Sequence, residues 1–286
     1  MIRGRLPAAG YNCGMRVTRR VVLRSLAGAG LAGVAGIGAY GFGVGRRLFD
    51  VAHTTIPLPT LPAALSGVTI GLISDIHCGE FMPADRVAHA ADLLMQERPD
   101  LILLGGDHVT WHDTKAVPLC ADGLSSLSAP LGVFAVAGNH DPEGALEQVF
   151  ESRGRIQVLR DEQVHIRTRG ETIALGGLRY WSQRTTDLRR LFKGAAGFPI
   201  LLAHDPRRLM QASELRLPLM LSGHTHGGQV VLPGIGAPAA WRFPVVAGLA
   251  RDGATTVYVT RGLGTVVLPV RFNCPPEISI LTLRRT

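Results

Sequence analysis

The 286-residue sequence lacks the patterns through which cysteine builds metal sites or disulfide frameworks. Its four cysteines, Cys13, Cys78, Cys120 and Cys274, are scattered, and no two form a Cys-x-x-Cys pair. This spacing excludes a zinc knuckle and a thioredoxin-type redox motif. Because Cys13 lies in the N-terminal leader, three cysteines remain in the body, and this odd number does not indicate a disulfide framework. We expect them to be small buried hydrophobic residues.

Acidic residues are absent before Asp50, so the excess positive charge belongs to the leader alone. Eight of the 30 basic residues lie there, which leaves 22 basic against 22 acidic residues in the body. A nucleic-acid-binding footprint should lie on the domain itself, so a formally neutral body predicts no nucleic-acid partner. The chain also lacks internal repeats and low-complexity segments beyond the leader. With 46% hydrophobic residues it can bury a sizeable core.

Residues 1–47 combine a basic stretch with an uncharged segment, as a targeting or anchoring sequence does. Thr18, Arg19, Arg20 and Arg24 precede residues 25–45, which carry no charge. The paired arginines resemble a twin-arginine export signal, and an anchor helix oriented by the positive-inside rule has the same pattern. No clear Ala-x-Ala cleavage site follows, so a retained anchor and a released domain both stay open. Either alternative places the body outside the cytoplasm of a bacterial-type cell, with the membrane and the export machinery as partners.

After the leader, the chain passes through a proline-rich stretch into alternating strand and helix patterns. Residues 48–66 hold three prolines and no amphipathic period, which predicts an extended connector to a domain over 67–286. Buried strands are expected at 68–74, 101–106, 132–138, 198–204 and 217–224, and helices at 83–98, 115–128 and 142–154. Arg169 and Gly170 are expected to turn a hairpin, and the C-terminal part to be purely β. The alternation predicts an α/β domain with a mixed sheet or sandwich.

Residues that commonly bind metals follow five of the predicted strands, at the point where each strand ends. They are Asp75 and His77, Asp107, Asn139 and His140, His204, and His224 and His226. The carboxyl ends of strands in an open α/β sheet meet at one crevice. Taken singly, an aspartate after a strand is usually a turn residue, and a lone histidine is usually a surface or core residue. Capping does not explain why every cluster is rich in glycine and lacks an apolar partner, so together they predict one shared metal site.

The donor atoms in this set favour two ions of a particular kind. Nitrogen and oxygen ligands without thiolates suit Mn, Zn or Fe. The two carboxylate oxygens of Asp107 can bridge ions about 3.5–4 Å apart, and such a pair activates a water and stabilises the attacking and leaving oxygens of a phosphoryl displacement. The residues therefore predict two divalent metal ions and a phosphate-ester substrate.

The order D-x-H, G-D, G-N-H-D, H and G-H-x-H resembles that of the calcineurin-like metallophosphoesterases, from about residue 68 to the C-terminus. Within that superfamily, LSGHTHGGQ and the ending PVRFNCPPEISILTL look like the exported or membrane-associated bacterial phosphodiesterase branch. The resemblance implies a sandwich of two mixed β-sheets flanked by helices. It also implies roles for the site residues. Asp75, His77 and His226 would hold one metal, Asn139, His204 and His224 the other, and Asp107 would bridge them, while His140 would stabilise the phosphoryl oxygens or protonate the leaving group.

One position departs from the family pattern, and two arginines are further candidates. Many relatives continue G-D-x-V-D, where the second aspartate can orient the histidine, but this chain has Thr110 there. Two alternatives stay open: Asp141 or Asp113 substitutes for that aspartate, or His140 is less strongly oriented. Arg261 and Arg271 are candidate substrate-binding residues, because arginine binds phosphate bidentately, although the alternative of a structural salt bridge is slightly favoured for each. His108, His112 and Cys78 are expected to be loop residues near the mouth of the site.

Three functions are consistent with these features. The first is an exported, metal-dependent phosphodiesterase acting on a phosphodiester or pyrophosphate, with a lipid or envelope substrate. The second is a UDP-2,3-diacylglucosamine pyrophosphatase-like hydrolase of lipid A synthesis, which the leader disfavours because UDP-linked substrates are cytoplasmic. The third is a non-catalytic metal-binding module, which should lack a ligand or His140. Because every one of those positions is filled, the first function is the prediction.

Overall fold

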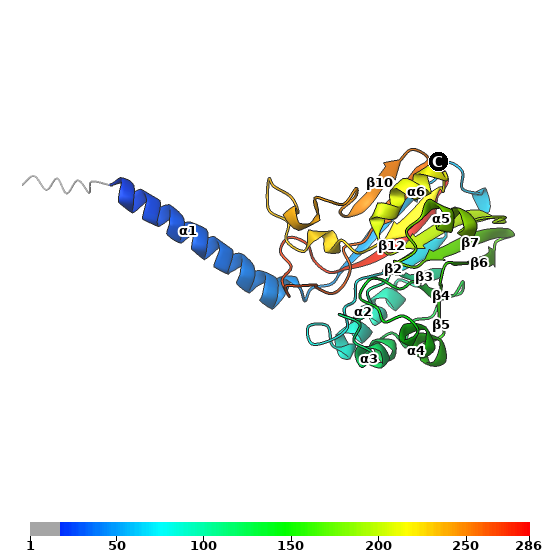
Figure 1. The fold of residues 1–286 in the computed structure, drawn as a ribbon, viewed down its shortest axis with the longest axis horizontal. Helices are drawn as coiled ribbons and strands as arrows, with labels where there is room; N and C mark the ends of the chain where they lie inside the picture. The colour runs from blue at the N-terminus through cyan, green and yellow to red at the C-terminus, as the bar shows by residue number, and fades with distance from the viewer. Residues whose placement is uncertain (1–17) are drawn as a thin grey trace, which may run out of the picture.

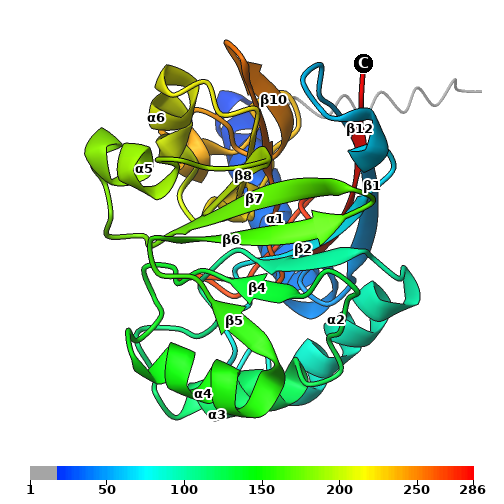
Figure 2. The same cartoon turned by 90° about the vertical axis from the view of Figure 1, so that its right-hand side faces the viewer.

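Two six-stranded mixed sheets pack face to face at the centre of the protein, in a computed structural model that describes residues 18–286 (Figures 1 and 2). The first sheet has the order β1 (Asp50–Pro57), β12 (Glu277–Arg284), β2 (Thr69–Ile73), β3 (Leu101–Leu104), β4 (Val133–Ala135) and β5 (Ile156–Val158). The second has the order β10 (Gly248–Asp252), β11 (Thr255–Val259), β9 (Leu219–Ser222), β8 (Phe198–Ala203), β7 (Glu171–Leu178) and β6 (Glu162–Thr168). The protein thus has the predicted α/β sandwich of two mixed sheets.

Strand β3 shows why the central strands are continuous apolar runs. Leu101 and Leu103 belong to the cluster between the two sheets, whereas Ile102 and Leu104 belong to the cluster beneath the helices. Side chains of a strand alternate between its faces, and both faces of this sheet are covered, so every position must be apolar. The run LILL therefore fixes the end of the strand. This end in turn positions Asp107, which lies three residues beyond it.

Helices cover the outer face of each sheet (Figure 2). Helices α2 (Ala84–Gln96), α3 (Ala116–Gly123) and α4 (Ala145–Gly154) lie against the first sheet, and α5 (Thr185–Leu191) and α6 (Leu209–Glu214) against the second. The first three confirm the helices expected from the sequence, although α3 ends at Gly123 rather than near residue 128. The two short helices α5 and α6 were not expected.

The segment expected to be a connector contributes a strand. Residues 50–57 form β1, which pairs in parallel with β12 over eight positions. The sheet therefore begins before residue 67, and the free connector before the domain is shorter than the sequence indicates. As an edge strand, β1 buries little of either face, so it carries no clear alternating pattern, and its prolines lie at and beyond its end, where no ladder hydrogen bond is lost.

Helix α1 (Arg19–Tyr40) projects from the domain and continues through a π-helical turn, Gly41–Gly45 (Figure 1). None of the residues of α1 is buried, and Thr18 caps its first turn. The span Arg19–Gly45, 27 residues, is long and apolar enough to cross a membrane, although a signal sequence has the same properties. Cys13 and the first three arginines of the leader lie outside the described residues.

Candidate metal centre

Parallel strands of both sheets end at the same place and deliver the predicted ligands there. Strands β2, β3 and β4 run parallel in the first sheet, and β8 and β9 run parallel in the second. Six of the seven predicted ligands form two groups in which all donor atoms lie within 4.8 Å of one another. One group is Asp75, His77 and His226, and the other is Asp107, His204 and His224. These groups could hold two metal ions.

Asp107 belongs to the second group and also faces the first. Its Oδ2 is 3.2 Å from His204 Nε2 and 3.6 Å from His77 Nε2, so one oxygen faces a member of each group. Its Oδ1 accepts the backbone N–H of His140 at 2.8 Å, which fixes the plane of the carboxylate. A carboxylate held in this way has the position that a bridging ligand requires.

Asn139, the seventh predicted ligand, has a side-chain oxygen without a hydrogen-bond partner. It follows β4, and its Oδ1 is buried without a hydrogen-bond partner. A buried amide oxygen without a partner loses free energy unless something else binds it. A cation is a suitable partner, and nitrogen and oxygen donors without a thiolate suit Mn, Zn or Fe. The residues present therefore fit the metals that the sequence predicts.

Two glycines let the ligands approach one another. A Cβ at Gly138 would lie 2.1 Å from Asp107 Oδ1, and one at Gly223 would lie 2.3 Å from Asp75 Oδ2. Five of the seven ligand residues also have φ between 50° and 71°, namely Asp75, His77, Asp107, His224 and His226. Such conformations cost on the order of 1–3 kcal/mol each and cluster at functional sites. Glycines here therefore serve the close approach of the backbone rather than the core.

Hydrogen bonds orient the histidines so that they present free nitrogens. His204 donates from Nδ1 to the carbonyl of Gly105 at 2.7 Å, which leaves Nε2 as the unprotonated nitrogen facing Asp107 when the ring is neutral. His77 contacts Thr110 Oγ1 through Nδ1 at 3.2 Å and directs Nε2 toward His226. Bonds of this kind set the tautomer and the direction of a metal-binding imidazole.

Burial keeps most of these imidazoles neutral. It lowers the pKa of His77 to about 4 and that of His224 to about 3, and it holds the pKa of His226 well below its ordinary value. Burial also raises the pKa of Asp75 to about 6. Neutral imidazoles are the form that binds metals, so these three histidines are ready to do so at neutral pH.

His204 and Asp107 behave as a charged pair instead. Burial opposes the charge on each, but the attraction between the two outweighs it, raising the pKa of His204 to about 10 and holding the pKa of Asp107 below its ordinary range. Without metal, His204 is therefore the one histidine of these four that carries an extra proton at pH 7.

Metal binding at pH 7 should release about one proton per protein molecule, and this proton comes from His204. Since its pKa lies above 7, the metal-free ring is protonated on both nitrogens, and a metal ion needs the Nε2 lone pair. Calorimetric titration of the stripped protein in buffers of different ionisation enthalpy measures this number. The release should fade above about pH 10, where the metal-free ring is already neutral. Binding that releases no proton at pH 7 would contradict the charged pair.

The comparisons with known proteins agree with this geometry. The family model for calcineurin-like phosphoesterases matches residues 68–228, which is more than half of the chain and includes all seven predicted ligands. The chain belongs to this family. As a phosphoesterase it is similar to the uncharacterized metallophosphoesterase YkuE of Bacillus subtilis, at 31% identity over 95% of this chain and 99% of that protein.

Two further relatives bear on activity and location. The phosphodiesterase YaeI of Escherichia coli is 34% identical over 74% of this chain and 80% of that protein. A zebrafish (Danio rerio) protein described as a transmembrane protein with a metallophosphoesterase domain is 30% identical over 82% of this chain and 57% of that protein. This phosphoesterase is thus a hydrolase of phosphoric ester bonds.

The phosphoesterase histidine that is not in either group, His140, is oriented by backbone. It is 8% exposed, and its Nδ1 accepts the N–H of Trp111 at 3.3 Å. When the ring is neutral, the proton must therefore be on Nε2. Its ring lies 5.0 Å from that of His77, at the edge of the metal centre. The site thus holds a positioned N–H donor next to the ligand groups.

Neither carboxylate expected to replace the missing family aspartate contacts His140. Asp141 bonds to the ring of His108 at 3.0 Å and to three backbone N–H groups, and Asp113 accepts the N–H of Lys115. Thr110 itself lies on His77, as described above. The expectation that Asp141 or Asp113 orients His140 is therefore wrong, because the loop after β3 places a backbone N–H there instead.

His108 and Asp141 form a buried pair that sequence reasoning missed. His108, expected near the mouth, is fully buried and packs its ring edge-on against Phe150. The carboxylate of Asp141 accepts the N–H groups of His108, Val109 and Gly138, so it ties the loop after β3 to the loop after β4. The pair holds Asp107 and Asn139 in register rather than reaching the mouth.

The two arginines predicted to bind substrate are occupied by the protein. Arg271 is fully buried, and its guanidinium donates to backbone carbonyls of residues 226, 261, 262, 264 and 274. It has no exposed donor for a phosphate, so its prediction as a substrate residue is wrong. Arg261 forms ion pairs with Asp50 and Glu277, which is the structural role that the sequence left open.

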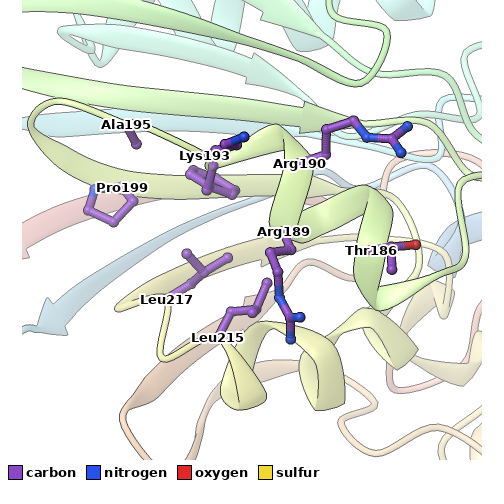
Figure 3. A pocket seen from close by; sticks show the side chains of 9 residues that line it. Thr186, Arg189, Arg190, Lys193, Ala195, Pro199, Leu215 and Leu217 are labelled. Carbon is purple, nitrogen blue, oxygen red and sulfur yellow. The ribbon is translucent and has the colours of Figure 1, made fainter.

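Two cavities of similar volume differ in their relation to the site. One of about 660 Å³ is lined by His77 and Thr110 at one end. Another of about 640 Å³ lies beside α5, where Figure 3 shows Arg189 on the helix, Lys193 just beyond its end, and Leu215 and Leu217 across from them. No candidate ligand lines the second cavity, so of the two only the first adjoins the predicted metal centre, through His77.

Proposed function

We propose that the protein is a phosphodiesterase that hydrolyses a phosphodiester or pyrophosphate with two divalent ions, Mn, Zn or Fe. The observation that carries the proposal is the position of Asp107. Its Oδ2 faces both His204, in its own group of ligands, and His77, in the other group. The similarity to the phosphodiesterase YaeI supports a diester rather than a monoester substrate.

The proposed ligands of the first ion are Asp75, His77 and His226, and those of the second are Asn139, His204 and His224, with Asp107 bridging. Ions bound there supply Lewis-acid chemistry, which lowers the pKa of a water and neutralises charge on the phosphate. The protein fixes both groups by strand ends and by the bonds of His204 and His77 to Gly105 and Thr110.

His140 is proposed to act on the phosphate or the leaving group through Nε2–H. Because the N–H of Trp111 occupies Nδ1, the donor of the neutral ring points away from the loop after β3. A donor at the edge of the metal centre can stabilise a phosphoryl oxygen or protonate the departing alkoxide, and such proton transfer contributes about 10²–10⁴-fold.

Replacing His140 with asparagine should lower kcat by about 10²-fold or more for a diester with an alkyl leaving group. The loss should be smaller for a p-nitrophenyl diester, because p-nitrophenolate leaves without protonation. Metal content should not change, since His140 is not a proposed ligand. The exposed residue His53, paired with Glu97 away from the metal centre, offers the matched control His53→Asn. Equal losses on both substrates would contradict a role of His140 in protonating the leaving group, and would leave only its role in stabilising the phosphoryl oxygens.

The test of the proposed function is hydrolysis of bis-(p-nitrophenyl) phosphate by the full chain, stripped of metal and then given Mn, Zn, Fe or Mg separately. Activity that returns with one of the metals supports the proposal and identifies a suitable ion. Two bound metals in a folded protein without turnover would contradict it and favour a binding module.

The proposed location is outside the cytoplasm, with residues 1–47 as a twin-arginine-like signal or a membrane anchor. Helix α1 supports this, because all of its apolar surface is unburied. The zebrafish relative, which is described as a transmembrane protein, agrees with this location. Reporter fusions at both ends test it, and a body found in the cytoplasm would instead allow the UDP-linked substrate.

A further inference from the structure

Four exposed apolar side chains line the cavity that adjoins the predicted metal centre at His77. The cavity is lined by His77 at one end and by Phe81, Trp111, Val267 and Leu268, here named the apolar rim. Their exposed fractions are 40%, 70%, 83% and 64% in that order. Single exposed apolar residues are ordinary, but a group around the entrance of a site indicates that another apolar surface covers it.

The three tryptophans of the chain are also exposed apolar side chains. All three are more than half exposed. Ring contacts join Trp111 to His140, and they join Trp181 through Tyr180 to His224. Trp241 lies two residues along the chain from Phe243, whose ring contacts His224. Tryptophan is enriched where a protein meets the interface of a membrane, so its concentration around the metal centre points to a bilayer.

The rim is held in place by a residue of the metal-binding turn. Gln229, which follows the two histidines of GHTHGGQ, donates from Nε2 to the carbonyls of Val266 and Leu268 and accepts the N–H of Val266. Val267 has a φ of 63°, which is strained for a β-branched residue. The three hydrogen bonds thus keep a strained loop that directs an apolar side chain into solvent, and such strain persists where it serves a function.

Helix α1 enters the domain at this rim. The carbonyl of Gly41 accepts the N–H of Arg271, in the segment just after the rim loop, and the rings of Phe42 and Phe81 are 6.3 Å apart. Figure 1 shows α1 leaving the domain on the side opposite α5 and β6. Since an apolar, unburied helix of this length can cross a bilayer, a membrane that receives α1 would lie against the rim.

A basic pocket adjoins the rim at the end of α1. Arg46, Arg47 and Arg86 line a cavity of about 380 Å³ together with Glu80 and Phe81, and these last two also line the cavity of the metal centre. Within residues 18–286 none of the three arginines forms an ion pair with a carboxylate. Arginines just beyond a membrane span attract anionic headgroups, by about 1 kcal/mol each.

We propose that the apolar rim and the basic pocket dock on the surface of a bilayer that contains anionic phospholipid, so that the metal centre takes the phosphodiester of a lipid directly from the membrane. The apolar side chains enter the boundary of the acyl chains, the arginines bind headgroup phosphates, and the cavity continues from there to His77. The inference rests on the proposed phosphodiesterase function and names its substrate as lipid-borne.

The docking is measured without using activity. The full chain is placed in vesicles of phosphatidylcholine and phosphatidylglycerol in which some acyl chains carry bromine. With Trp181→Phe and Trp241→Phe, Trp111 is the sole tryptophan, and its fluorescence should fall by about half as bromine in the interface contacts it. In the control all three tryptophans become Phe, and Glu171→Trp adds one tryptophan at the start of β7. This strand runs parallel to β8, so its start lies at the end of the strands away from the metal centre. Equal quenching at both places, or none at Trp111, would overturn the proposal.

Negative charge placed on the apolar rim should slow the hydrolysis of a lipid more than that of a soluble substrate. Val267→Glu with Leu268→Glu should relieve the quenching of Trp111 and slow hydrolysis of a lipid with a p-nitrophenyl phosphodiester by about tenfold or more. Hydrolysis of bis-(p-nitrophenyl) phosphate, which has the same leaving group but does not need the membrane, should fall by a much smaller factor. The control Arg167→Glu makes the same change of net charge on the exposed face of β6, and it should change neither rate. Equal losses on both substrates would overturn the docking role of the rim.

The headgroup part of the proposal has its own variant. Arg46→Gln with Arg47→Gln should remove most of the difference in lipid hydrolysis between vesicles with and without phosphatidylglycerol, which we expect to be about tenfold or more. If the wild type hydrolyses the soluble diester but shows no preference for anionic vesicles, the basic pocket is not a headgroup site. If it hydrolyses no diester while Trp111 is quenched, the proposed function fails and the docking stands.

Discussion

Replacing Asp107 with asparagine should lower phosphodiesterase activity by about 10³-fold or more and reduce bound metal from two ions to one. Asparagine keeps the shape and one oxygen, but it loses the charge and the second acceptor. Oδ1 of Asp107 is already taken by the N–H of His140, and only Oδ2 faces His77 and His204. Hydrolysis of bis-(p-nitrophenyl) phosphate and elemental analysis of the purified protein measure the two effects.

The same substitution should also change His204. Without the carboxylate, the attraction that raises its pKa to about 10 disappears, so metal binding at pH 7 should no longer release the proton from this ring. The exposed Asp122, paired with Arg153, provides the control Asp122→Asn, which should retain activity and both metals. Two bound metals and unchanged turnover in Asp107→Asn would show that this carboxylate does not bridge.

The convergence of the candidate ligands could be predicted from the sequence because each of them follows a strand. A continuous apolar run such as LILL is buried on both faces, so it identifies its strand and the end of that strand without reference to the rest of the fold. Parallel strands then place Asp107 and its counterparts at one edge. The Arg169–Gly170 turn was predicted for the same local reason, and both residues have the positive φ that such a hairpin turn needs.

The partners of the ligands could not be predicted, because they depend on how loops cross. Thr110 lies near His77 only because the loop after β3 passes beside the end of β2, as the bridge between Cys78 and Val109 shows. The N–H of Trp111 has no signature in a sequence at all. Strand β1 was missed since an edge strand with one buried side chain out of eight carries no periodic signal.

Arg271 shows how a residue type can mislead. An arginine near the end of a family motif suggests a phosphate contact, but a guanidinium also has five donors that can gather carbonyls from several loops. Here it collects those of the turn after β9, the loop after β11 and the segment at Cys274. In this way it supports His226 and the rim loop together, and no local sequence pattern reveals which carbonyls surround it.

Replacing Arg271 with methionine should therefore destabilise the protein by about 3–5 kcal/mol, because it leaves several buried carbonyls without donors. The midpoint of thermal unfolding should fall by roughly 10 °C. Arg271→Lys keeps the charge, but its donors come from a single atom, so it should fall between the methionine variant and the wild type. If the methionine variant does not fold, the lysine variant carries the test, and its metal affinity should fall because the carbonyl of His226 loses its donor.

The control for this prediction is the exposed Arg169, whose pair with Asp100 is 3.8 Å long. Arg169→Met should change the free energy of unfolding by no more than about 0.5 kcal/mol, since an exposed ion pair contributes little. If Arg271→Met unfolded at the wild-type temperature and retained its metals, the carbonyls around it would have to find other donors, and Arg271 would again be available as a substrate residue. A loss confined to KM, without loss of stability, would lead to the same conclusion.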